Sequence, residues 1–233
     1  MRGQDFELVG DNGQRIGAYV ARPSRLPAPG VIVLQEIFGV NPFIRSVVDK
    51  FASQGFIAIA PQLYWRQQKD VQLDSEKDVD QALGFLRNLD EGEALHDAQI
   101  ALEFLRSSPD CTGKVAAVGY CLGGKLSYLL AARSTIDAGV SYYGTGVHTV
   151  LDEATALKAP VMLHVASEDY LCPPAAQKRI VEVLEPLANA TVHLYKGAPH
   201  GFVRIGKPYY DSAAAELADS RTGDFLRTEL DLN

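Results

Sequence analysis

Short apolar runs alternate along the chain with longer segments whose apolar residues recur about every 3.6 positions. The short runs predict strands at residues 6–9, 15–21, 30–34, 56–60, 115–118, 138–143, 161–166 and 191–195. The longer segments predict helices at residues 43–54, 75–89, 93–107, 126–132, 175–187 and 212–226. This alternation favours an α/β fold, with a mostly parallel central sheet and helices on both faces.

Turn and capping residues refine these elements. The first two strands flank an Asp-Asn-Gly turn at residues 11–13, which predicts a hairpin. We expect Pro61 to end the strand at 56–60 and Ser75 to be the N-cap of the helix at 75–89. The polar residues 64–74 predict an excursion over the surface. Without an internal repeat or a linker, the simplest organisation is one domain over residues 1–233.

Composition narrows the functional class. The chain has 233 residues, of which 47% are hydrophobic, and its formal net charge of −7 argues against a nucleic-acid partner. No apolar run is long enough to cross a membrane, and the first residues carry no apolar signal region. Three cysteines, Cys111, Cys121 and Cys172, cannot all pair with one another. An unpaired thiol suits a reducing compartment, so we expect a cytoplasmic protein that does not bind membranes. We expect a monomer, because no predicted strand or helix has a large exposed apolar face.

One hexapeptide carries the first chemical signal, Gly119-Tyr120-Cys121-Leu122-Gly123-Gly124. It lies between a predicted strand and a predicted helix, the setting of the nucleophile elbow G-x-S-x-G, with cysteine in the serine position. The outer glycines leave room for a strained backbone. A cysteine there would sit at a helix N-terminus, whose partial positive charge favours the thiolate. Alone, the motif fits a packed thiol as well as a nucleophile.

Two later loops supply the groups that a cysteine nucleophile needs. An acid follows the strand at 161–166, and its distance from Pro173 favours Asp169, with Glu168 as the alternative. His200 stands on a Gly/Pro-rich loop after the last strand, where a positioned imidazole is useful. The chain order is nucleophile, acid, histidine, as in sheets that use an elbow.

A further loop, residues 35–39, directly follows the buried strand at 30–34. Folds with an elbow place an oxyanion-hole amide in this loop. We expect the backbone N–H of Leu122 to be one donor and that of Ile37 the other. Glu36 would be drawn into the site at the same end of the sheet.

Several motifs together resemble the dienelactone hydrolase family of α/β hydrolases, in order and over nearly the whole chain. The motifs are Gln35-Glu36-Ile37-Phe38-Gly39-Val40-Asn41, the Cys121 hexapeptide, Tyr142-Tyr143-Gly144, and the loops of Asp169 and His200. The resemblance implies an α/β-hydrolase fold in which Cys121 is the nucleophile, His200 the general base and acid, and Asp169 its orienting carboxylate.

The same resemblance implies roles for other side chains. Glu36 contacts the cysteine in the empty site and helps to take its proton, while Arg204, Phe38 and Tyr142 bind substrate. The implied reaction is the hydrolysis of an enol-lactone, dienelactone, to maleylacetate through a thioester, as in catechol and chlorocatechol degradation. It requires no cofactor and no metal, only a small lactone or ester as partner.

The sequence departs from the family pattern where substrate would bind. Lactonases of the family carry a second arginine and a tyrosine in the helix before the elbow, where this chain has Val79 and Leu83. Arg87, one or two turns further along, is the candidate to replace that arginine. The family's serine after the histidine is Gly201 here. A carboxylesterase or thioesterase acting on a less anionic ester or lactone is therefore an alternative, and a non-catalytic binding module a remote one.

Overall fold

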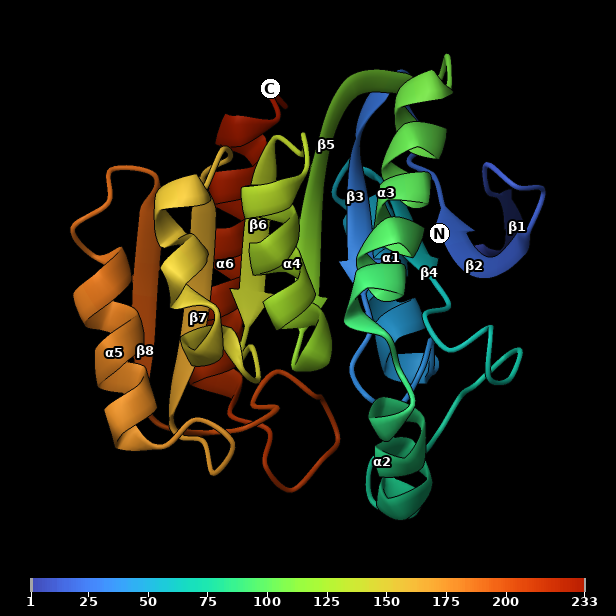
Figure 1. Ribbon diagram of the computed structural model, residues 1–233. Helices are drawn as coiled ribbons and strands as arrows, with labels where there is room; N and C mark the ends of the chain where they lie inside the picture. The colour runs from blue at the N-terminus through green and yellow to red at the C-terminus, as the bar shows by residue number, and fades with distance from the viewer. Residues whose placement is uncertain (1, 233) are drawn as a thin grey trace. The chain divides into compact units, whose positions relative to one another are not determined.

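The computed structural model describes residues 2–232 and divides the chain into two compact units, Met1–Ala117 and Val118–Asn233 (Figure 1). Strand β5, Cys111–Tyr120, begins in the first unit and ends in the second. Each unit has its own sheet strands and helices. That the whole chain forms one domain stays a prediction.

The first unit contains four strands in the order β1-β2-β4-β3. The four strands are β1 Gln4–Val9, β2 Arg15–Ala21, β3 Ala28–Leu34 and β4 Ile57–Pro61. β1 and β2 pair antiparallel, which confirms the predicted hairpin, while β3 and β4 pair parallel. β3 is buried along its whole length, as its continuous apolar run requires.

Three helices of this unit are α1 Pro42–Ser53, α2 Val79–Arg87 and α3 Glu91–Ser107. α1 begins where expected because the Asn41 side chain accepts a hydrogen bond from the Ile44 amide at 3.2 Å and Pro42 follows it. The predicted cap at Ser75 is wrong: α2 begins four residues later, with Asp78 as N-cap. Pro61 does not stop β4 but belongs to it, opposite Ala18.

The segment 64–74 is not the surface excursion that its polarity suggests. Tyr64, Val71 and Leu73 are buried, and they form a core cluster with Phe38 and Ala82. A few apolar residues are enough to bury this segment, because their side chains point into the core while the polar residues between them face solvent. The Asn41 side chain donates to the Leu73 carbonyl at 3.1 Å and holds the segment in place.

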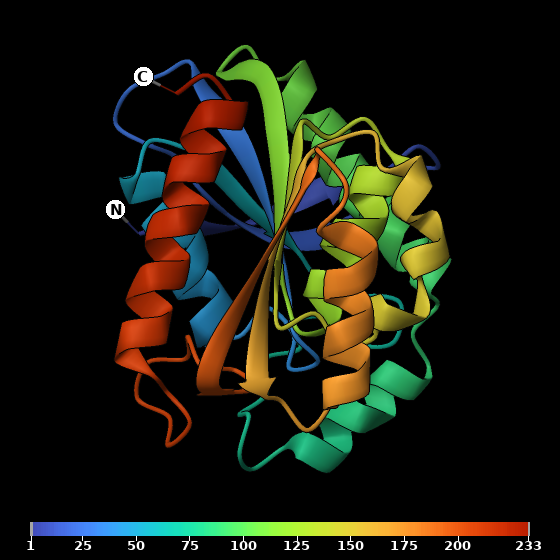
Figure 2. The same cartoon turned by 90° about the vertical axis from the view of Figure 1, so that its left-hand side faces the viewer.

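The second unit contains three parallel strands after the end of β5, in the order β6-β7-β8. They are β6 Ala138–Tyr142, β7 Val161–Glu168 and β8 Ala190–Pro199. The helices are α4 Leu122–Arg133, α5 Pro174–Leu184 and α6 Ser212–Glu229. α5 and α6 pack on opposite faces of these strands (Figure 2). Loops that follow the carboxyl ends of parallel strands meet at one edge, where sites are usually built.

A buried polar network attaches α6 to this sheet. His164 on β7 contacts the Tyr195 hydroxyl through Nδ1 and the Thr222 hydroxyl through Nε2, both at 2.8 Å. The Tyr142 hydroxyl lies 2.7 Å from the same Thr222 oxygen. Burial, with the nearby charges of His193 and Arg221, lowers the pKa of His164 well below its ordinary value. His164 is therefore neutral at pH 7.

Candidate active site

The Cys121 elbow has the backbone that its sequence predicts. β5 ends at Tyr120, α4 begins at Leu122, and Cys121 between them has a φ of 52°, in the left-handed region that disfavours side chains. A Cβ on Gly119 would overlap the backbone of Gly123. Glycine is therefore required there, and the tight turn lifts the cysteine to the end of the strand.

Cys121 is held at its main chain and at its sulfur. Its N–H donates to the Tyr142 carbonyl at 3.0 Å, and its carbonyl accepts from the Thr145 amide at 3.1 Å. The Cys121 Sγ lies 3.3 Å from the Thr145 hydroxyl. The loop that follows β6 therefore fixes the position and the rotamer of the thiol.

Asp169 and His200 meet at the ends of β7 and β8. The Asp169 Oδ2 lies 2.7 Å from the His200 Nδ1, and its other oxygen accepts from the Leu171 amide at 2.8 Å. The two side chains are 1% and 10% exposed. The ring of Tyr143 packs edge-on against the imidazole, with centroids 4.8 Å apart. With Nδ1 bound to the carboxylate, Nε2 is left for chemistry.

The environment of His200 favours its charged form. Burial alone lowers the pKa of His200, but the charge of Cys121, the hydrogen bonds to Asp169 and Cys121, and the charge of Asp169 together raise it to about 10. The imidazole therefore carries a proton near pH 7. A cysteine and a protonated histidine in contact, with a carboxylate behind the ring, can carry out nucleophilic acyl transfer.

Arg204 is buried in the loop after His200. Its Nη1 donates to the Tyr209 hydroxyl at 2.8 Å. The Tyr209 ring also fills the space beside Gly201, because a Cβ on Gly201 would lie 3.0 Å from that ring. With a φ of 79°, Gly201 is in the backbone region that glycine adopts most readily. Gly201 and Tyr209 thus act together to shape the surroundings of the guanidinium.

Apolar side chains lie exposed on the same loops. Tyr170 and Ile205 are both 81% exposed, although they neighbour Asp169 and Arg204 in the chain. The Tyr170 ring centroid lies 6.0 Å from that of His200. Partial burial, followed by the charges of Cys121 and Asp169, raises the pKa of Tyr170. Tyr170 therefore lies close enough to Cys121 for the charge of the sulfur to act on it, and its ring is exposed beside His200.

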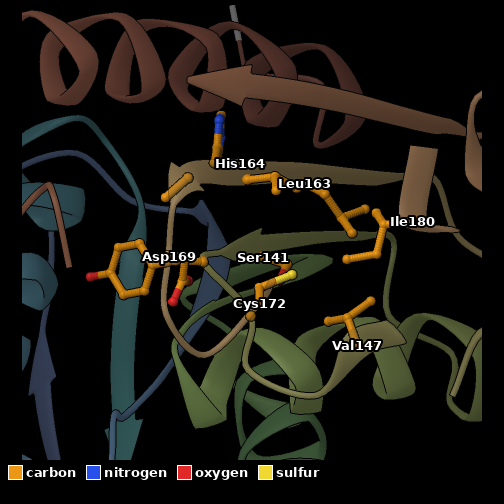
Figure 3. A pocket seen from close by; sticks show the side chains of 11 residues that line it. Ser141, Val147, Leu163, His164, Asp169, Cys172 and Ile180 are labelled. Carbon is orange, nitrogen blue, oxygen red and sulfur yellow. The ribbon is translucent and has the colours of Figure 1, made fainter. Parts of the chain in front are cut away.

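A small enclosed cavity lies behind Asp169 (Figure 3). Ser141, Cys172, Val147 and Ile180 are among the side chains around it. Its volume of about 10 Å³ accommodates at most one water molecule. Cys172 lies 5% exposed there, and burial with the charge of Asp169 raises its pKa to about 11. Cys172 is an inert thiol beneath the Asp169 loop, and the cavity is too small for a substrate.

Tyr142 does not have the place expected of a substrate-binding residue. It is buried, and its hydroxyl is bonded to Thr222 and to the Ala218 carbonyl of α6. Successive residues of a strand face opposite sides of a sheet, and Tyr142, the last residue of β6, faces α6. Tyr143 follows directly, outside the strand, with a φ of 38°. Tyr143, rather than Tyr142, contacts His200.

The remaining predicted residues lie in the first unit, except Leu122. Glu36 is buried directly after β3, and the Gln35 side chain bonds the Glu36 carbonyl and the Leu63 amide at 3.2 and 3.1 Å. Phe38 is part of the core cluster with Tyr64, and Ile37 packs against it. Leu122 supplies the first amide of α4, a position whose N–H has no partner inside a helix.

The described residues contain no group of three or more His, Cys, Asp or Glu side chains arranged to hold a metal ion. Within residues 2–232, no helix has both the length and the apolar character needed to cross a membrane.

Comparison with known proteins decides the family. The sequence profile of the dienelactone hydrolase family matches residues 16–230. The chain belongs to the dienelactone hydrolase family. It is 36% identical over 228 residues to carboxymethylenebutenolidase 1 of Cupriavidus pinatubonensis, covering 97% of each chain. It is 37% identical over 217 residues to a carboxymethylenebutenolidase of Pseudomonas putida, covering 92% of each. The protein is thus a carboxylic ester hydrolase.

Solved structures confirm the α/β-hydrolase fold. A putative dienelactone hydrolase from Klebsiella pneumoniae superposes with a TM-score of 0.85 over 100% of both chains, at 25% identity. An acylaminoacyl peptidase from Pyrococcus horikoshii has a TM-score of 0.73 over 100% of this chain and 42% of its own, at 18% identity, and so shares the fold alone.

Residues that the sequence did not single out complete the site. Four further side chains lie against the residues predicted from the sequence, namely Thr145 against Cys121, Tyr143 and Tyr170 against His200, and Tyr209 against Arg204. Tyr143 stands inside a motif quoted for the family, and Tyr170 is adjacent to Asp169, so proximity in the sequence was a usable signal. Thr145 and Tyr209 depend on contacts between loops, for which the sequence gives no pattern.

Proposed function

We propose that this hydrolase opens an enol-lactone, converting dienelactone to maleylacetate through a thioester on Cys121. His200 would serve as general base and acid, and Asp169 would orient it. The observation that carries the proposal is the position of His200: it lies 2.7 Å from Asp169, and the charge of Cys121 helps to raise its pKa to about 10. The names of the relatives support the substrate.

Acylation begins with the Cys121 thiolate attacking the lactone carbonyl. The carbonyl oxygen becomes an alkoxide, which the Leu122 amide would stabilise; one such donor contributes roughly 3 kcal/mol. The ring C–O bond then breaks and the enolate leaves, taking a proton from His200. An enolate is a good leaving group, so this step needs little acid assistance.

Deacylation returns the enzyme to its starting state. Neutral His200 takes a proton from water, and the resulting hydroxide attacks the thioester carbonyl. The C–S bond breaks and its electron pair returns to Cys121, while His200 keeps the proton taken from water. The carboxylic acid product gives its proton to solvent and leaves as a carboxylate. Asp169 keeps Nδ1 protonated through both steps, so that Nε2 always faces the reacting atoms.

Glu36, Phe38 and the Ile37 amide enter the proposal from the family resemblance. Where Cys121 is a thiol in the empty site, Glu36 would take its proton as substrate binds and return it when the product leaves. Phe38 would contact the substrate, and Ile37 would supply the second oxyanion donor. We also propose that the enzyme acts in the cytoplasm, since its three cysteines are unpaired thiols, which suit a reducing compartment. We further propose that it acts as a monomer and without a cofactor.

Arg204 supports a substrate with a carboxylate. A guanidinium binds a carboxylate with two parallel hydrogen bonds, and a buried one does so with less competition from water. Arg204 is buried in the loop that follows His200. We propose that it holds the carboxylate of the lactone.

A less anionic ester or lactone is a second candidate substrate. Val79 and Leu83 are 40% and 37% exposed on α2, at the positions where the family's lactonases carry an arginine and a tyrosine. Tyr170 and Ile205 add exposed apolar surface in the second unit. A carboxylesterase or thioesterase activity on an apolar acyl group would use the same nucleophile.

The proposal is tested by comparing the wild type with Cys121→Ala on dienelactone and on p-nitrophenyl acetate. We expect Cys121→Ala to lose kcat on both substrates by at least about a thousandfold, because the nucleophile is gone. Mass spectrometry of quenched wild-type enzyme should show the acyl group on the peptide that contains Cys121.

Cys111→Ser is the matched control, since it removes a thiol at the start of β5 and should retain wild-type rates. Equal turnover by wild type and Cys121→Ala would refute the cysteine mechanism. Turnover of the simple ester but not of dienelactone would select the second candidate.

A further inference from the structure

The Thr145 hydroxyl lies 3.3 Å from the sulfur of Cys121. We propose that Thr145 is a positioning residue that donates its hydroxyl hydrogen to the Cys121 thiolate and stabilises it, both before attack and when it leaves the thioester. This inference rests on the proposed function, because it requires Cys121 to be the nucleophile. It adds a second polar neighbour to a sulfur that already contacts His200.

The backbone fixes where this hydroxyl lies. The Thr145 amide donates to the Cys121 carbonyl at 3.1 Å, and the Cys121 amide donates to the Tyr142 carbonyl at 3.0 Å. The two residues are therefore joined at main chain and side chain together. Threonine is β-branched and has few allowed χ1 rotamers, so little side-chain entropy is lost when its hydroxyl bonds the Cys121 sulfur.

The direction of the hydrogen bond follows from the charge. A thiolate can only accept, whereas a threonine hydroxyl can donate, so ionisation of Cys121 aligns the two groups. A hydrogen bond to a charged group is stronger than one between neutral groups. The bond is therefore stronger to the thiolate than to the thioester sulfur, and it favours the departure of the thiolate during deacylation.

Stabilising a thiolate has two opposing effects on its reactivity. It raises the fraction that is ionised, but it lowers the intrinsic nucleophilicity of the sulfur, with a Brønsted coefficient of about 0.4–0.5. When the midpoint of thiol ionisation shifts by one pH unit, the ionised fraction below that midpoint changes about tenfold. The nucleophilicity of the thiolate changes about threefold in the opposite sense. This opposition distinguishes the proposed bond from a contact that serves only for packing.

The experiment uses Thr145→Val, which keeps the shape and removes the hydroxyl, and Thr145→Ser, which keeps the hydroxyl. The rate of alkylation of Cys121 by iodoacetamide is measured from pH 4 to 10 by mass spectrometry of its peptide. For Thr145→Val we expect the midpoint to rise by about one pH unit and the plateau rate to rise about threefold. Thr145→Ser should match the wild type on both.

Steady-state kinetics on p-nitrophenyl acetate provide the second readout. We expect kcat of Thr145→Val to fall about tenfold at pH 7, because the thiolate that leaves during deacylation loses its hydrogen-bond donor. The ratio kcat/KM, which reports acylation, should change less than kcat. Thr149→Val is the matched control: its hydroxyl donates to the Gly146 carbonyl at 2.7 Å, one turn further along the same loop. It should match the wild type.

An unchanged alkylation profile in Thr145→Val would overturn the inference, as would equal changes in Thr145→Val and Thr145→Ser. If Thr145→Val lacks a native near-ultraviolet spectrum, Thr145→Ala replaces it with the same expected shift, and equality of Ala and Ser variants refutes the bond. Activity retained by Cys121→Ala would instead refute the proposed function, independently of Thr145.

Discussion

The side chain of Arg204, for which we propose a role in binding substrate, is held by its neighbours in the loop after His200. Its guanidinium is buried and donates to the Tyr209 hydroxyl at 2.8 Å. The Tyr209 ring takes the space that a side chain at position 201 would otherwise occupy. The absence of a side chain at Gly201 therefore leaves room for the Tyr209 ring, whose hydroxyl accepts a hydrogen bond from Arg204.

We predict that Tyr209→Phe weakens binding of carboxylate-bearing substrates alone. The ring remains beside Gly201, but the hydrogen bond that orients Arg204 is lost, and a bond to a charged donor stabilises by about 1.5–3 kcal/mol. KM for dienelactone should rise about tenfold with kcat within a factor of two, while p-nitrophenyl acetate is unaffected.

Tyr210→Phe, at the adjacent tyrosine, is the control and should behave as the wild type. Equal losses on the charged and the neutral substrate would show that Tyr209 serves the loop as a whole and does not orient Arg204.

At this scale the sequence predicts residues that stand in an ordered motif. Asp169 and His200 could be found because each follows a recognisable strand, and the structure places them 2.7 Å apart. Thr145 could not, because its contact with Cys121 depends on the neighbouring position of β6, and nothing in its local sequence differs from an ordinary loop threonine.

At the scale of the elements, the strand–turn–helix unit around Cys121 depends on close backbone contacts. Gly119 faces the backbone of Gly123, and a Cβ on Gly124 would lie 2.7 Å from the Gly144 Cα. α4 can therefore start directly at the end of β5. This closeness explains why Gly124 stands in the first turn of α4 despite its low helix propensity.

We predict that Gly119→Ala destabilises the protein by about 2 kcal/mol or more, because the added methyl group overlaps main-chain atoms that cannot rotate away. The urea midpoint should fall with the slope m unchanged. Gly84→Ala provides the matched control, since its Cβ would meet only the Arg87 side chain at 3.8 Å in α2; it should stabilise the helix by about 0.5–1 kcal/mol. Similar midpoints for the two variants would contradict this account.

Element boundaries show where sequence patterns fail. The apolar runs locate the described strands, most directly β3 and β4, which are buried along their whole length and so need continuous apolar residues. The start of α2 was misplaced because Ser75 has a suitable side chain, whereas the chain makes a turn there that involves Asp74 and Asp78. Burial of Tyr64 and Leu73 was missed because it depends on Phe38, far away in sequence.

At the scale of the whole molecule, the buried network around His164 links stability to pH. His164 is neutral because burial, His193 and Arg221 lower its pKa well below the ordinary 6.5. Tyr195 and Thr222 satisfy both ring nitrogens. Below pH 6.5 His164 becomes protonated in the unfolded chain but stays neutral in the folded protein, so acid favours unfolding.

We predict that the free energy of unfolding decreases as the pH falls from about 6.5, with a contribution from His164 of at most about 1.4 kcal/mol per pH unit. Urea unfolding at pH 7.5, 6.5, 5.5 and 4.5 measures it. His164→Gln should be less stable at pH 7.5, because hydrogen bonds are lost, but should lose less on acidification. Parallel pH curves for the two proteins would contradict the assignment.

The bonds that anchor the elbow come from main-chain atoms: Cys121 N–H to Tyr142, Thr145 N–H to Cys121, and Tyr143 N–H to the His164 carbonyl at 2.8 Å. An exchange of the Cys121 or Thr145 side chain leaves these main-chain bonds in place, unless it introduces a proline. A gene descended from this one can therefore replace the sulfur by oxygen, or the hydroxyl beside it by a methyl group, and inherit the same scaffold. Over generations, such lineages are free to change the chemistry of this position while keeping its backbone geometry.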